Sequence, residues 1–74
     1  MFLTQDETYW YYDIVGTRFK LVYNFRKKYL MVVDKIIQRE VKAFDGVHFR
    51  SIKDFEQEGR LYFLGFTKST FGVN

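Results

Sequence analysis

Tyrosine, methionine and basic side chains recur through the first half of the chain, and their types fit a binding chemistry. They occur two positions apart or in one short run: Tyr9, Tyr11, Arg18, Lys20, Arg26, Lys27, Lys28, Tyr29 and Met31. Tyr, Met and Arg are enriched at the centres of protein–protein interfaces. Tyrosine rings also stack on unpaired nucleobases, while Arg and Lys neutralise phosphates. The set therefore indicates a binding surface for one of these two classes of partner.

Groups suited to catalysis or metal binding are sparse. The chain has no cysteine and a single histidine, His48, so it offers neither a thiolate zinc site nor a histidine cluster. Ser51 is explained as a helix cap, and Asp54, Glu56 and Glu58 fall in a short expected helix. The five glycines are far apart and form no phosphate-binding loop. We therefore expect no enzyme activity, no cofactor and no metal.

Length, charge and hydropathy indicate one small domain over residues 1–74, with 1–7 and 67–74 loosely held. Aromatic residues make up 22% of the chain, which raises the apolar area that a small core can bury. The net charge is +3, and the positive charge is concentrated in residues 18–42. No run reaches the roughly 18–20 apolar residues of a membrane span, and the acidic start is unlike a signal peptide. We expect a cytoplasmic protein that does not bind membranes.

Three strands joined by two hairpin connections are predicted in the first half of the chain. They span Tyr9–Val15, Arg18–Asn24 and Tyr29–Lys35, where apolar and polar residues alternate. Gly16-Thr17 is a glycine-first pair that suits a type II′ turn, and residues 25–28 form a polar loop. A three-stranded antiparallel meander follows from this pattern.

A short helix is predicted at Ser51–Glu58, followed by another strand. Ser51 is a favourable N-cap, and Asp54 stands three residues later, where a capping box has its acid. Gly59 is expected to end the helix in the left-handed conformation. Arg60–Phe66 is apolar on both faces, which is typical of an internal strand.

Residues 36–44 fit either a helix or a strand. As a helix, the segment places Ile37 and Val41 on one face; as a strand, it alternates these two residues with polar ones. Asp45-Gly46 suits a type I′ hairpin turn, and the following Val47–Arg50 is rich in β-formers. This turn signal favours the strand.

The two hairpin connections fix which side chains share a face of the sheet. Asp13 is expected opposite Lys20, and Tyr11 opposite Val22. One side is then the predicted core face: Trp10, Tyr12, Ile14, Phe19, Leu21, Tyr23, Leu30, Val32 and, at its end, Asp34. The other side carries most of the charge: Tyr9, Tyr11, Asp13, Val15, Arg18, Lys20, Val22, Asn24, Tyr29, Met31, Val33 and Lys35. Whether later elements cover this second side is left open by the sequence.

The elements together predict an α+β to mostly-β fold, with a small curled antiparallel sheet of four to six strands and one short helix near 51–58. Their order, with a late Asp-Gly turn, a short helical segment and a final strand, resembles small SH3-like or OB-like barrels. The resemblance covers the architecture and implies a curled, barrel-like sheet.

The function expected from these observations is that of a non-catalytic binding module. The first hypothesis is protein binding, as an adaptor or inhibitor, through the Tyr/Met/basic face, or self-association through an exposed strand edge. The alternative is binding of single-stranded nucleic acid through the same face and the loop Arg26-Lys27-Lys28.

Overall fold

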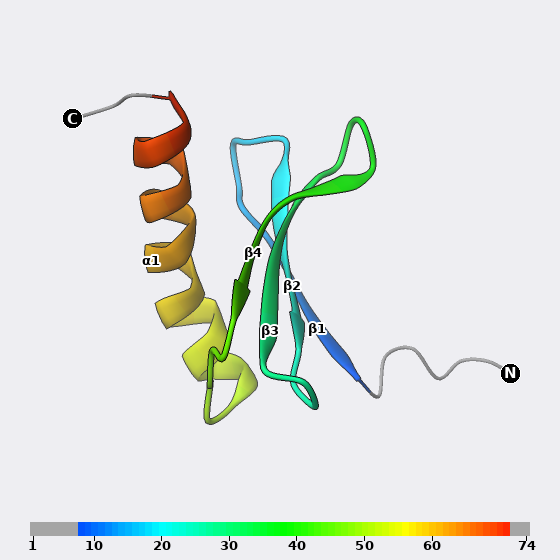
Figure 1. The fold of residues 1–74 in the computed structure, drawn as a ribbon, viewed down its shortest axis with the longest axis vertical. Coiled ribbons are helices and arrows are strands. Elements are labelled where there is room, and N and C mark those ends of the chain that lie inside the picture. The colour runs from blue at the N-terminus through cyan, green and yellow to red at the C-terminus, as the bar shows by residue number, and fades with distance from the viewer. Residues whose placement is uncertain (1–7, 72–74) are drawn as a thin grey trace, which may run out of the picture.

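The computed structural model describes residues 8–71 as one antiparallel sheet and one α-helix (Figure 1). The elements in chain order are β1 (Tyr9–Asp13), β2 (Phe19–Asn24), β3 (Tyr29–Asp34), β4 (Arg39–Asp45) and α1 (Ile52–Phe71). Each strand pairs with its neighbour in sequence, which gives the sheet order β1-β2-β3-β4. The α+β fold class is confirmed.

The sheet is open, with β1 and β4 at opposite edges, so the likeness to closed barrels does not extend to its topology. Of the ends expected to be loosely held, 1–7 and 67–74, residues 1–7 and 72–74 lie outside the described residues, whereas residues 67–71 belong to α1.

The predicted register of the first three strands is confirmed. Asp13 pairs with Lys20, and Tyr11 with Val22, as the alternation required. The first turn is centred one residue earlier than predicted, because the Thr17 N–H donates to the Ile14 carbonyl at 3.1 Å. Gly16 then occupies the third turn position with φ of 82°, where a positive φ favours glycine.

The β2–β3 and β3–β4 loops are built alike. The first follows Asn24 and the second follows Asp34, and both of these side chains carry an oxygen that accepts hydrogen bonds from the loop backbone. Asn24 Oδ1 accepts the backbone N–H groups of the residues two and three positions later, at 3.1 and 3.0 Å. Asp34 Oδ1 does the same at 2.9 and 3.3 Å. Both loops end on a residue with φ of 57°, Lys28 in one and Gln38 in the other. This Asx-type turn returns the chain for β4, so residues 36–44 contribute a strand, as the turn signal favoured.

The helix begins where predicted but is much longer than expected. Ser51 Oγ accepts the Asp54 N–H at 3.1 Å, which caps the first turn. Gly59 does not end the helix, and the strand prediction for Arg60–Phe66 is wrong because this segment continues α1. The reason is packing: Phe55, Gly59, Phe63 and Phe66 recur at helical spacing and are all buried.

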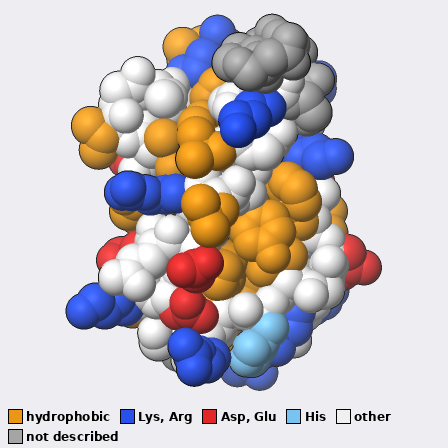
Figure 2. All heavy atoms as spheres, turned by 90° about the vertical axis from the view of Figure 1, so that its left-hand side faces the viewer, with side chains coloured by type: hydrophobic (Ala, Val, Ile, Leu, Met, Phe, Trp, Pro, Cys, Tyr) orange, Lys and Arg blue, Asp and Glu red, His pale blue; other side chains and the backbone are white. Residues whose placement is uncertain are grey.

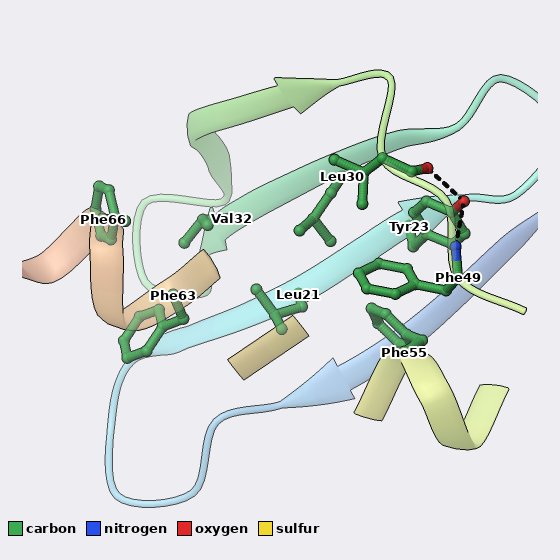
Figure 3. Packing of buried hydrophobic residues seen from close by; sticks show 9 residues of the cluster. Leu21, Tyr23, Leu30, Val32, Phe49, Phe55, Phe63 and Phe66 are labelled. Carbon is green, nitrogen blue, oxygen red and sulfur yellow. Dashed lines mark hydrogen bonds between the residues drawn. The ribbon is translucent and has the colours of Figure 1, made fainter. Parts of the chain in front are cut away.

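Helix α1 packs on one face of the sheet, and aromatic side chains fill the space between the two layers (Figures 1 and 3). The predicted core face is confirmed, because Leu21, Tyr23, Leu30 and Val32 are fully buried on it. Phe55 lies among three rings of β1 and β2, with centroid distances of 5.9–6.3 Å.

The segment between β4 and α1 was predicted as a strand over Val47–Arg50, but it is irregular. Its backbone is held by the Tyr23 hydroxyl, which donates to the Val47 carbonyl at 2.7 Å and accepts the Phe49 N–H at 3.3 Å (Figure 3). Val47 and Phe49 are buried against the core. The Val47 N–H also donates to the Lys28 carbonyl at 2.9 Å, and the Arg50 N–H donates to Asp54 Oδ2 at 2.9 Å, so separate hydrogen bonds hold this segment in place of a strand ladder.

Candidate functional site

The face of the sheet opposite α1 is covered by no other element of residues 8–71, and we call it the open face (Figure 1). Alternation and register assign its members: Tyr9, Tyr11, Asp13, Lys20, Val22, Asn24, Tyr29, Met31, Val33, Glu40, Ala43 and Asp45. It contains most of the Tyr/Met/basic set predicted from sequence. Those residues are thus not a second core layer beneath α1.

An apolar stripe crosses the middle of the open face from edge to edge. Tyr11, Val22, Met31 and Ala43 are successive cross-strand neighbours in the four strands. Tyr11 is 45% exposed at one end, whereas Val22 is only 7% exposed between its neighbours. The face therefore has a packed apolar centre whose outer atoms remain accessible.

Tyrosine side chains on the open face are held by their neighbours. The rings of Tyr9 and Tyr11 lie 6.3 Å apart, and Lys20 Nζ lies 5.7 Å from the Tyr11 ring centroid, within cation–π range. The Tyr29 hydroxyl donates to Glu40 Oε2 at 3.1 Å. This hydrogen bond, followed by desolvation and the negative charges of Glu40 and Asp45, raises the pKa of Tyr29 above 10.0. These contacts restrict the rings before any partner arrives.

A hollow of about 410 Å³ lies at one end of the face, where the loop after β2 meets the tyrosines. It is lined by Tyr9, Asn24, Lys27, Tyr29, Met31 and Asp45. Of the predicted basic loop, only Lys27 lines it. Lys28 folds back, and its Nζ donates to the Phe25 carbonyl at 3.1 Å. Arg26 is exposed and lies outside the hollow.

Two of the other basic residues predicted for this face are engaged by acids. Arg18 Nε lies 2.9 Å from an oxygen of Asp34, so this guanidinium is drawn to the end of the sheet. Lys35 Nζ lies 3.7 Å from Asp13 Oδ1. Part of the positive charge predicted for this side is therefore paired with acidic side chains.

Sequence reasoning missed the contribution of β4, which adds Glu40, Ala43 and Asp45 to the open face. An irregularity between Val32 and Val33 shifts the pairing there, so simple alternation would not have assigned all three. The recurrence of an Asx residue at 24 and 34 was the available signal, because it predicts a second loop of the same length.

Acidic and histidine side chains are dispersed in the described part of the chain. Within residues 8–71, no three His, Asp or Glu side chains are grouped to hold a metal ion. No helix there has the length and apolar character to cross a membrane.

Comparison with known protein families, curated proteins and solved structures finds no match to this chain.

Proposed function

We propose that this chain is a non-catalytic protein-binding module, in the role of an adaptor or inhibitor, and that the open face is its contact surface. The observation that carries the proposal is the uncovered stripe of Tyr11, Val22, Met31 and Ala43 between charged residues. An apolar, aromatic centre with a polar rim is the usual anatomy of a protein interface.

Mixed charge on the open face favours a protein partner over a nucleic acid. Asp13, Glu40 and Asp45 stand among the lysines, and each acid would repel a phosphate backbone. A protein surface can instead present opposite charges to both signs. The restricted tyrosine rings support binding at this face with either class of partner, because less side-chain freedom is lost on binding.

Single-stranded nucleic acid is the second candidate, and one observation favours it. Lys27 lies with Tyr9 and Tyr29 around the hollow at the end of the face, which combines a cation with two stacking rings. A labelled oligonucleotide that is retained at low salt, and released steeply as salt rises, would make this the better assignment.

The protein-binding proposal is tested with Tyr11→Ala and a matched control, Leu61→Ala on α1. Both side chains are exposed apolar groups, but they lie on opposite sides of the sheet. A protein captured by the wild-type chain is expected to bind Tyr11→Ala roughly thirtyfold more weakly, as for an interface hot spot of about 2 kcal/mol. Leu61→Ala is expected to bind normally.

Circular dichroism and thermal unfolding check that both variants keep the fold. Equal capture by Tyr11→Ala, Leu61→Ala and the wild-type chain would show that the open face is not the contact surface.

A further inference from the structure

A second hollow lies on the helix side of the molecule, between α1 and the β1–β2 turn. Its volume is about 330 Å³, and its lining consists of Tyr12, Ile14, Val15, Arg60, Phe63 and Leu64. This volume is at the lower end of small-molecule sites, which span about 300–1,000 Å³. Figure 2 shows this side, where hydrophobic side chains gather among Lys and Arg side chains.

Apolar surface at this hollow remains in contact with water. Val15 is 93% exposed and Leu64 is 52% exposed, although Phe63 beside them is buried. An apolar ligand seated here would remove part of this surface from water, which is favourable in proportion to the area covered. The hollow therefore favours a ligand with an apolar body.

Arg60 places a positive charge at the same hollow without an acidic partner. Its Nη1 donates to the Tyr12 hydroxyl at 3.5 Å. Among the described residues it forms no ion pair, and this includes Glu56, one turn earlier on α1. The hydrogen bond to Tyr12 and the accompanying Coulombic attraction raise the pKa of Arg60, against an opposing effect of burial. The guanidinium keeps its charge and most of its donors for a ligand.

Tyr12 supplies a second donor. Its oxygen accepts the bond from Arg60, so its own proton has no acceptor among residues 8–71. A hydroxyl beside a guanidinium can bind the same carboxylate, one through O–H and the other through N–H. Both polar groups of the lining can therefore donate hydrogen bonds to the same ligand.

We infer that this hollow binds a small carboxylic acid with an apolar tail. The carboxylate lies on Arg60 and Tyr12, and the tail packs on Ile14, Val15 and Leu64. One guanidinium matches the single charge of a carboxylate, and charge-assisted Arg–carboxylate bonds are among the stronger polar contacts in proteins. The site is independent of the open face, because it lies on the other side of the sheet.

The test is a titration of the full chain with octanoate, followed by NMR. Two ligands separate the contributions: 1-octanol has the same tail without the charge, and acetate has the charge without the tail. Octanoate is expected to saturate shifts at the lining residues, and both comparison ligands are expected to bind at least about tenfold more weakly. The inference would be overturned if the NMR shifts did not saturate at millimolar octanoate, or if 1-octanol bound as tightly as octanoate.

Variants locate the carboxylate. Arg60→Gln is expected to weaken octanoate binding roughly tenfold or more, because it removes charge-assisted hydrogen bonds. Lys53→Gln removes the same charge from an exposed position near the start of α1 and is expected to leave binding unchanged. Tyr12→Phe is expected to weaken octanoate but not 1-octanol. Equal effects of Arg60→Gln and Lys53→Gln on octanoate binding would refute the assignment. The test of the open face with Tyr11→Ala is independent of this outcome.

Discussion

Replacement of Gly59 by alanine is expected to destabilise the domain, whereas the same replacement at Gly65 is expected to stabilise it. Both glycines lie inside α1, where alanine is favoured over glycine by about 1 kcal/mol. They differ in what the added methyl group meets. At Gly65 nothing lies within 4 Å of a Cβ, whereas at Gly59 the Cβ would lie 3.0 Å from Leu21 Cδ1.

The magnitude at Gly59 follows from the surroundings of Leu21, which is 0% exposed. A buried side chain in a close-packed core has little room to withdraw, and overpacking by a methyl group costs about 1–3 kcal/mol. Subtracting the helix-propensity gain leaves a net loss of up to about 2 kcal/mol for Gly59→Ala. Gly65→Ala gains about 1 kcal/mol, so the two variants differ by roughly 1–3 kcal/mol.

Thermal and urea unfolding of the two variants, measured beside the wild-type chain, provide the assay. For a domain of this size, each kcal/mol shifts the midpoint temperature by about 4–8 °C, so the order of the variants is readily resolved. If Gly59→Ala were as stable as Gly65→Ala, the close approach of α1 to β2 at Leu21 would be refuted. The core arrangement around Phe55 would then need revision.

Two further predictions concern single polar groups. Tyr23→Phe removes the hydroxyl that bridges Val47 and Phe49, and it is expected to cost about 1–3 kcal/mol in urea unfolding; an unchanged midpoint would contradict the role of this hydroxyl. Burial alone raises the pKa of Asp34, but hydrogen bonds from Arg18 and two backbone N–H groups outweigh it and hold the pKa below 3.8. The carboxylate therefore stabilises the fold above its unfolded-state pKa, and this contribution is lost as the pH falls through the lower folded-state pKa. Asp34→Asn is expected to lower stability at neutral pH and to flatten its acid dependence, and a pH profile as steep as the wild type's would argue against this account.

The sheet was predictable from sequence because its signals are local and agree. Apolar alternation and the polar loop agree on one register, in which Asp13 faces Lys20 as expected, although the first turn is centred one residue earlier than predicted. The side of the sheet that carries Tyr9, Tyr11 and Met31 follows directly from this register. Its exposure did not follow, because exposure depends on where the C-terminal third of the chain packs.

The C-terminal third was mispredicted because its two signals conflict. Arg60–Phe66 is rich in residues with high β-propensity, and Gly59 precedes it as a helix breaker would. The buried positions Phe55, Gly59, Phe63 and Phe66 nevertheless follow helical spacing. Tertiary packing decides between these signals, and glycine is favoured at 59 because a Cβ there would lie 3.0 Å from Leu21 Cδ1. From sequence alone, Gly59 is explained by its backbone conformation at a helix end, whereas in the structure it avoids a close contact with Leu21.

The two loops built on Asn24 and Asp34, together with the first turn, have a consequence for how the chain folds. Hydrogen bonds or strand pairs join residues 14 and 19, 24 and 29, and 34 and 39, so each hairpin closes over four residues. Closing such short loops costs little chain entropy, and proteins dominated by local pairing fold quickly. We expect the sheet to assemble by successive zipping along the chain, with the docking of α1 as the slower, long-range step. During that interval the aromatic core face would stand exposed to solvent, because its cover comes from α1 and the segment before it.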